Sequence, residues 1–250
     1  MHEIISEGFR LDAHLARPTP AASSARLPAV ILLAGFPRGT GGAAMSGNTY
    51  PPFADRIAAE VGWAALAFHH RGTAASEGDF SIDGWLTDIR CAVAALRARD
   101  DISGIWLAGF RLGGSLAIVA AANDPLIRGV AAFGAPASLQ DWVPDIGRFE
   151  QYCRRVGVIR DPKFPVDINA WGNAIAKLDI VGAAAAMAPR QLLVVHGSHD
   201  DVVDIDHARR LGAAVPKHAD VRVIEHGAHR LRHDPRATAM LFGWLDRQLV

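Results

Sequence analysis

The chain has 250 residues, 50% of them hydrophobic and 21% charged, which excludes a disordered chain and indicates a globular protein. Its 26 lysines and arginines equal its 26 aspartates and glutamates, so nucleic acid and anionic membranes are not expected as main partners. Two cysteines are too few for a disulfide framework, and no apolar run approaches the ~20 residues of a membrane span, so we expect a cytoplasmic protein.

Strands and helices are predicted in alternation along the chain. The N-terminal stretch MHEIISEGFRLD lacks a signal-peptide pattern. Residues 1–17 alternate apolar and polar around Gly8 and predict an antiparallel hairpin, with a loop at 18–27. Apolar runs predict buried strands at 29–34, 63–68, 105–108, 129–133, 191–195 and 221–224. Helices are predicted at 51–61, 81–98, 116–122, 204–214 and 235–249.

The helix at 81–98 carries the clearest local signals. Ser81 is a suitable N-cap and Asp83 lies in the first turn. The apolar stripe of this helix is Trp85, Ile89, Val93 and Leu96. Because strands alternate with such amphipathic helices, the sequence predicts an α/β domain over residues 1–250, with a mostly parallel sheet covered by helices on both faces.

Residues 138–189 interrupt the alternation, because they contain no clear buried strand. An insertion after a mid-sheet strand is expected over the carboxyl ends of the strands, so we interpret this segment as a small helical lid. An ordinary surface excursion is the alternative. Its aromatic side chains fit either the core of a lid or the wall of a substrate pocket, and they are Trp142, Phe149, Tyr152 and Trp171.

The segment GIWLAGFRLGGS, residues 104–115, has the pattern of a nucleophile elbow. An apolar strand turns sharply into an apolar helix, and Gly109 and Gly113 lie two residues on either side of the apex. Such an apex is strained and normally carries a nucleophile. Here it carries Arg111.

Two later loops complete the pattern: HGSHDDVV after one strand and HGAHRL after the last strand. The chain order of apex, acid and histidine is 111, 200 and 229. With LLAGFPRG and FHHRGTAASEGDFS, these stretches resemble the α/β-hydrolase superfamily, in its esterase and acyl-peptidase-like group. The resemblance covers nearly the whole chain and implies the α/β-hydrolase fold.

The resemblance also implies roles for individual residues. Asp200 matches the acid and His229 the base of the family's triad, while the backbone N–H groups of Phe36 and Leu112 match its oxyanion hole. Asp201 is the rival acid, and its alternative role is to cap a helix that begins near Val203.

Arg111 departs from the family pattern, which puts a covalent acyl-enzyme in doubt. Arginine at a helix start, next to backbone donors, favours an anion such as a carboxylate or phosphate. The alternative is that it fills space or points to solvent. No other residue is expected to replace the nucleophile, and those considered are Ser76, Cys91, Ser115 and Ser198.

The 11 histidines raise the question of a metal site. His196, His199, His226 and His229 all follow strands, and zinc needs three or four such ligands. We expect no metal, because these loops fit the resemblance without one, and His69 and His70 fit a turn. The glycines at 109, 113 and 114 lack the G-x-G-x-x-G spacing, so no cofactor is expected.

Three functions remain open. The first is hydrolysis of a small ester, thioester or amide-like substrate by a variant mechanism, in which His229 and Asp200 act as general base and Arg111 binds an anionic group. The second is a catalytically inactive protein, a pseudo-hydrolase that binds a small ligand or a partner. The third is metal-assisted hydrolysis. The expected partner is a small molecule, with an anionic one favoured by Arg111, and a homodimer is left open.

Overall fold

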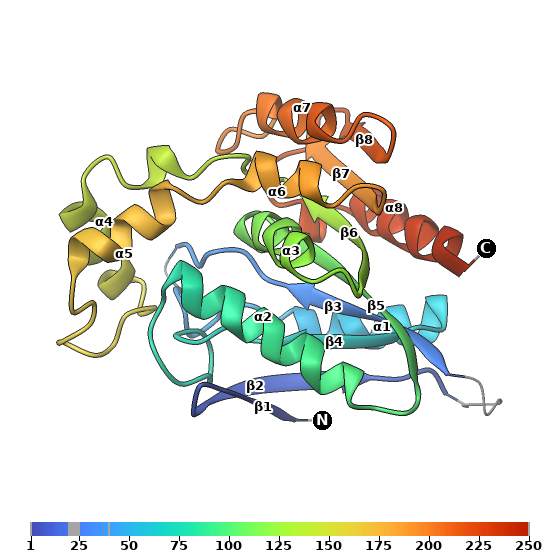
Figure 1. Cartoon of the computed structure of the whole chain (residues 1–250), viewed down its shortest axis with the longest axis horizontal. Helices are drawn as coiled ribbons and strands as arrows, with labels where there is room; N and C mark the ends of the chain where they lie inside the picture. The colour runs from blue at the N-terminus through green and yellow to red at the C-terminus, as the bar shows by residue number, and fades with distance from the viewer. Residues whose placement is uncertain (1, 20–25, 40, 250) are drawn as a thin grey trace.

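A computed structural model describes residues 2–19, 26–39 and 41–249 (Figure 1). An eight-stranded sheet runs through the molecule in the order β1-β2-β4-β3-β5-β6-β7-β8. The β1–β2 and β2–β4 pairs are antiparallel and the remaining pairs are parallel. The strands are β1 (Glu3–Ser6), β2 (Phe9–Ala16), β3 (Leu27–Leu33), β4 (Ala64–Phe68), β5 (Ile102–Phe110), β6 (Ile127–Phe133), β7 (Gln191–Gly197) and β8 (Ala219–Ile224).

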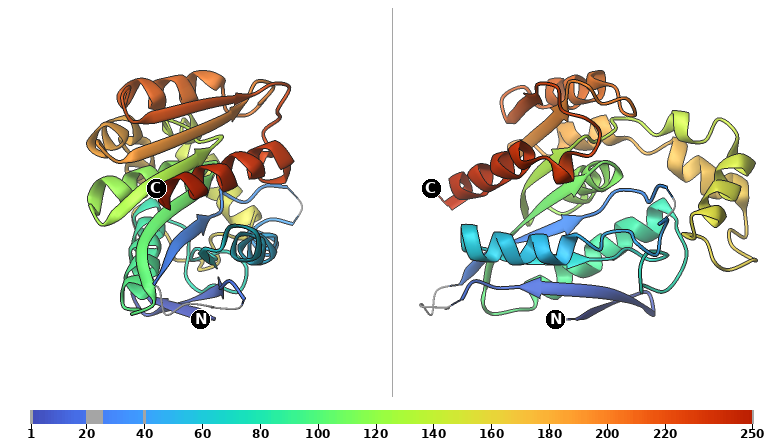
Figure 2. Two further views of the ribbon diagram at one scale, coloured as in Figure 1. Left: turned by 90° about the vertical axis from the view of Figure 1, so that its right-hand side faces the viewer. Right: turned by 180° about the vertical axis from the view of Figure 1, so that it is seen from behind.

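Helices cover both faces of the sheet. Figure 1 shows α2, α3, α6 and α7 over one face, and the reverse view in Figure 2 shows α1 and α8 over the other. The α-helices are α1 (Tyr50–Val61), α2 (Ile82–Arg97), α3 (Leu112–Asn123), α4 (Ile146–Arg155), α5 (Ile168–Ala176), α6 (Ile180–Ala186), α7 (Ile205–Ala214) and α8 (Pro235–Asp246). Short 3-10 helices are η1 (Gln140–Trp142), η2 (Leu231–His233) and η3 (Arg247–Leu249).

The central strands are apolar on both sides, because each side faces a separate core. In β3, Ile31 and Leu33 belong to the core under α2 and α3. Val30 and Leu32, which alternate with them, belong to the core under α1 and α8. A strand buried on both faces must be continuously hydrophobic, and this is why the sheet could be predicted from apolar runs.

The predicted elements are confirmed, with differences at their ends. The burial predicted for the strand at 221–224 is wrong: Val221 and Val223 are 39% and 47% exposed, because β8 lies at the edge of the sheet. Ser81 caps α2 by accepting a hydrogen bond from the Gly84 N–H at 3.0 Å, and the predicted apolar stripe of this helix is buried. Helix α3 begins four residues before the predicted start, at Leu112. The predicted loop at 18–27 lies partly outside the described residues, at 20–25, and Leu27 already belongs to β3.

Residues 138–189 form η1, α4, α5 and α6 and contain no strand. Figure 1 shows α4 and α5 projecting from one end of the molecule, whereas α6 lies along the sheet near α3. The role of this segment as a lid, and the treatment of residues 1–250 as one domain, stay predictions.

The aromatic side chains of this segment pack against the body of the protein. Trp142, Phe149 and Tyr152 have their ring centroids 5.7, 5.8 and 6.2 Å from that of Phe36. Trp171 donates a hydrogen bond from Nε1 to the Phe80 carbonyl at 3.0 Å. These aromatic residues therefore extend the hydrophobic core, which answers one question that the sequence left open.

Across the described part of the chain, no helix is both long and apolar enough to cross a membrane.

Candidate functional site

The turn between β5 and α3 has the backbone geometry of a nucleophile elbow. Arg111, its only residue, has φ 55° and ψ −126°, a conformation that costs a non-glycine residue ~1–3 kcal/mol. Its N–H donates to the Phe133 carbonyl at 2.7 Å, and its own carbonyl accepts from the Gly114 N–H at 2.9 Å. The strained turn is thus fixed to the neighbouring strand and to the first turn of the helix.

Glycines at 109 and 113 are required by the close packing of this turn. A Cβ atom on Gly109 would lie 2.2 Å from the Gly113 carbonyl oxygen, and one on Gly113 would lie 2.4 Å from the Leu33 carbonyl oxygen. Both distances are far inside van der Waals contact, and the atoms met belong to the backbone. The small residues predicted on either side of the apex are therefore explained by packing.

Asp200 and His229 are brought together beside the elbow. Asp200 follows β7 and His229 follows β8, and the His229 Nδ1 atom lies 2.9 and 3.0 Å from the two carboxylate oxygens of Asp200. Asp200 also accepts hydrogen bonds from the N–H groups of Val202 and Val203, both at 2.9 Å. Its side chain is fully buried, whereas that of His229 is 11% exposed.

The pKa of Asp200 lies below its ordinary value. Burial alone would raise this pKa, but the hydrogen bonds from His229 and from the N–H groups of Val203 and Val202 outweigh burial. Asp200 is therefore ionised near neutral pH, and an ionised carboxylate at Nδ1 favours the histidine tautomer that carries its proton there.

The two loops that carry this pair are held together by their backbones. The His199 N–H donates to the Gly227 carbonyl at 2.9 Å, and Ser198 Oγ accepts from the His226 N–H at 2.8 Å. A Cβ atom on Gly197 would lie 2.2 Å from the Gly227 oxygen. Glycine at 197 lets the acid loop and the histidine loop approach closely enough for the contact.

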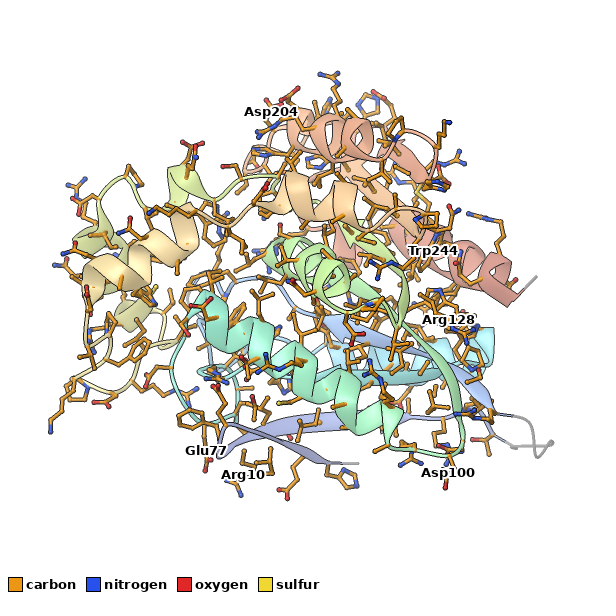
Figure 3. All side chains as sticks on the ribbon, in the orientation of Figure 1. Arg10, Glu77, Asp100, Arg128, Asp204 and Trp244 are labelled. Carbon is orange, nitrogen blue, oxygen red and sulfur yellow. The ribbon has the colours of Figure 1, made fainter. Side chains whose placement is uncertain are left out.

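The alternative role considered for Asp201 is wrong. Helix α7 begins at Ile205, and its N-cap is Asp204, which accepts from the Asp206 N–H at 2.7 Å. Figure 3 labels Asp204 at this helix. The helix begins one residue after the predicted start at 204, and Asp200 occupies the N–H groups of Val202 and Val203 in a preceding turn.

A cavity of about 620 Å³ lies over the elbow and the histidine. Its walls come from the loop after β3, the start of α1, the elbow, and the loop after β8. Both Arg111 and His229 line it, and so do Arg38, Arg230 and Arg232. No residue of the 138–189 segment is among the residues found to line it, so the aromatic side chains of that segment do not form this wall.

The Arg111 side chain lies along Gly35 and lines this cavity. A Cβ atom on Gly35 would lie 2.8 Å from the Arg111 Nε atom. Among the described residues the guanidinium forms no hydrogen bond and no ion pair. Burial lowers the pKa of Arg111, Tyr50 raises it, Arg38 and Arg230 lower it further, and the Asp200 carboxylate raises it. Arg111 is therefore half-buried, and no described carboxylate lies within ion-pair distance of it, although Asp200 acts on it from farther away.

No protein-family model matches this sequence, and no curated protein matches it either. Solved structures, in contrast, are similar to this chain. The chain is similar to Est1E from Butyrivibrio proteoclasticus, solved with ferulic acid bound, at 20% identity and TM-score 0.72, over 100% of this chain and 98% of that one. It is also similar to GrgF from Penicillium sp. sh18, described as an alpha/beta hydrolase, at 16% identity and TM-score 0.75, over 98% and 96% of the two chains.

The chain has the α/β-hydrolase fold. A third similar structure with this fold is XC6422 from Xanthomonas campestris, described as a serine hydrolase without a lid, at 20% identity and TM-score 0.62, over 98% and 90% of the two chains. In this fold the nucleophile, acid and histidine follow the chain order seen here at 111, 200 and 229.

The two backbone N–H groups predicted as oxyanion donors belong to Leu112 and Phe36. Leu112 is the first residue of α3, so its N–H has no acceptor within the helix. Phe36 follows β3, and in the described part of the chain its N–H also donates to no other group. The ring of Phe36 is buried in the aromatic core. Their role as an oxyanion hole stays a prediction.

The serines considered as other nucleophile candidates in this α/β-hydrolase fold form structural hydrogen bonds. Ser115 is buried and donates to the Pro136 carbonyl at 2.6 Å, and Ser76 donates to the His69 carbonyl at 2.6 Å. Ser198 accepts the His226 N–H, as described above, and Cys91 is half-buried on α2. Ser46, which the sequence analysis did not consider, is the serine found among the cavity-lining residues described.

Tyr50 is a second cavity residue that sequence reasoning missed. Burial raises the pKa of Tyr50 to about 12, while Arg111 and Arg232 act to lower it.

The titration of Tyr50 can be measured by itself. The chain has two tyrosines, so Tyr152→Phe leaves Tyr50 as the only one. Its phenol absorbance should titrate near pH 12, and Arg232→Gln should move the midpoint higher. A midpoint near 10 would contradict this placement of Tyr50.

In the described ranges, no group of three or more His, Cys, Asp or Glu side chains is placed to hold a metal ion. The histidines that follow strands instead pair with other groups. His196 Nε2 lies 2.8 Å from the Val203 carbonyl, and the rings of His199 and His226 contact each other at 4.8 Å between centroids.

Proposed function

We propose that this protein hydrolyses a small ester, thioester or amide-like substrate without a covalent acyl-enzyme, using His229 and Asp200 to activate water. One observation carries the proposal. His229 Nδ1 is bonded to a buried carboxylate, while its Nε2 is buried and has no partner among the described residues, and other atoms of His229 line a cavity shared with Arg111. A histidine oriented in this way is a general base.

In the proposed reaction, His229 Nε2 takes a proton from water as the water oxygen attacks the carbonyl carbon of the substrate. The carbonyl oxygen gains the negative charge and accepts hydrogen bonds from the Phe36 and Leu112 N–H groups. His229 then returns the proton to the leaving group as its bond to carbon breaks. Asp200 stays ionised and stabilises the imidazolium between these steps.

Arg111 is the reason for proposing water rather than a side chain as the nucleophile. Arginine stands where a Ser, Cys or Asp would attack, and a guanidinium remains protonated and is not nucleophilic. We assign it the binding of an anionic group of the substrate. Without a nucleophile, a triad site retains roughly 10³–10⁴-fold catalysis over water in well-studied cases, so a slow enzyme is expected.

A second candidate function is that of a binding protein with no turnover. Arg111 favours this function because an arginine at the elbow prevents formation of an acyl-enzyme. His229→Ala separates the two. For a hydrolase, turnover of the substrate should fall by about 10²-fold or more, because that is the usual contribution of a general base. For a binding protein, neither form shows turnover and ligand affinity is kept.

The matched control is His226→Ala, because His226 is an exposed histidine in the same loop and is not among the cavity-lining residues. Circular dichroism and thermal melting should show that both variants are folded. Equal losses in His226→Ala and His229→Ala would contradict a specific role for His229.

A further inference from the structure

We infer that the cavity over the elbow binds a small molecule carrying at least two negative charges, of the class of phosphate monoesters and dicarboxylates. Four arginines line this cavity, namely Arg38, Arg111, Arg230 and Arg232, and the carboxylate found among its lining residues is that of Asp201. The inference deepens the proposed function and rests on it in one respect: the dianion is taken to be part of the substrate.

The charge of this cavity departs from that of the whole chain. The protein carries a formal net charge of zero, yet the cavity wall carries four arginines and one aspartate. The ionised Asp200 behind His229 also acts on Arg111, which leaves a net of two positive charges around the cavity when its histidines are neutral. None of the four arginines lies within ion-pair distance of a carboxylate among the described residues. Clustered cations without counter-ions repel one another, and a bound anion relieves that repulsion.

Arg71 shows how the same protein compensates a buried arginine that has a structural role. Its Nη2 atom lies 2.8 Å from Asp88 Oδ1 and its Nη1 atom lies 3.0 Å from Glu7 Oε2. A third bond joins it to Ser6 Oγ at 3.0 Å. The arginines of the cavity lack carboxylates of this kind, which indicates that their counter-ion comes from outside the chain.

Arg232 is held in place without being neutralised. Its Nη2 atom donates to the Thr49 carbonyl at 2.7 Å, and its guanidinium carbon lies 3.8 Å from the centroid of the Phe53 ring. Its Nε atom is buried and has no hydrogen-bond partner among the described residues. A cation fixed by a ring and a carbonyl, with an unused donor, is prepared for an anion.

The four arginines lie at two depths. Arg111 and Arg232 are half-buried and both lower the pKa of Tyr50, and the guanidinium carbon of Arg232 lies 5.5 Å from the centroid of the Tyr50 ring. Arg38 and Arg230 are exposed, and each lowers the pKa of Arg111. One anionic group can bind at the inner pair while the outer pair compensates the second charge. A single negative charge would leave one of the two net positive charges without a counter-ion.

Isothermal titration with inorganic phosphate, succinate and acetate tests this inference. Phosphate or succinate should bind saturably and at least about tenfold more tightly than acetate, because charge-assisted bonds to arginine are the strong ones. Tighter binding of phosphate identifies a phosphate ester, and tighter binding of succinate identifies a dicarboxylate. Equal binding of acetate and both dianions would overturn the inference.

Variants locate the binding. Arg111→Gln and Arg232→Gln should each weaken the binding of the preferred dianion by about tenfold or more. The control is Arg97→Gln, which removes an exposed arginine paired with Asp124 at 2.6 Å, away from the cavity. If Arg97→Gln weakens binding as much as Arg111→Gln does, the ion is held by general surface charge and the inference is wrong.

The same titration, combined with an assay of ester hydrolysis, distinguishes failure of this inference from failure of the proposed function. His229→Gln should keep dianion affinity and lose hydrolysis of an acyl ester that carries the preferred group. Dianion binding without any turnover in the parent protein would reject the hydrolase proposal and leave the inference standing. Turnover of neutral esters without dianion binding would reject the inference and leave the hydrolase proposal standing.

Discussion

Arg111→Ser should create serine-esterase activity that the parent protein lacks. The elbow backbone is already formed at Arg111, and His229 is already bonded to Asp200, so a serine would complete the triad. Activity on short acyl esters should rise by about 10³-fold or more over the parent, because loss of a triad nucleophile has a cost of at least that size. The measurement is release of p-nitrophenol, with a burst from the acyl-enzyme.

An active-site phosphonate probe gives a second readout for the same change. The parent should not be labelled, whereas Arg111→Ser should be labelled at the new serine. Arg111→Ala is the control, because it also removes the guanidinium but adds no hydroxyl. Labelling of the parent at Ser46, which lines the cavity, would show that the nucleophile had been misassigned. No activity in Arg111→Ser would show that His229 is misplaced for catalysis.

Gly113→Ala should prevent folding or severely destabilise the protein. Its new Cβ would lie 2.4 Å from the Leu33 oxygen and 2.6 Å from the Ala34 oxygen, and neither backbone atom can move without breaking the sheet. We expect a loss of about 4 kcal/mol or more. For a domain of this size, that lowers the melting temperature by about 10 °C or more, measured by thermal melting followed by circular dichroism.

Gly243→Ala is the matched control, because it makes the same chemical change within α8. There the nearest atom, Arg247 Nη1, would lie 3.6 Å from the new Cβ, which is ordinary contact. This variant should be as stable as the parent or more stable by ~1 kcal/mol, since alanine favours a helix. Equal effects of the two substitutions would contradict the tight packing at Gly113.

The central strands could be predicted because they are buried on both faces and are therefore continuously apolar, whereas β8 at the edge is largely exposed. Element ends were less accessible to sequence reasoning. Helix α7 begins after an expected start near Val203, because the Asp200 carboxylate binds N–H groups that a helix would otherwise use. That competition depends on the acid being held by His229, a contact between residues 29 positions apart.

The candidate site was predicted in part. The positions of Asp200, His229 and Arg111 follow from their motifs, each of which is local in sequence. Arg232 and Tyr50 were missed because their importance arises only when η2 packs against the start of α1. The close spacing of arginines in HGAHRLR was the available signal, but sequence alone does not show whether such arginines meet carboxylates or one another.

The strained backbone at Arg111 has a consequence for protein engineering. Its conformation is imposed by the Phe133 carbonyl and by Gly109 and Gly113, so it does not depend on the side chain that occupies position 111. Serine, cysteine, aspartate and threonine could each be installed there and compared on an identical frame. Differences in their rates would then report the intrinsic reactivity of each nucleophile, free of the changes in scaffold that complicate comparisons between natural enzymes.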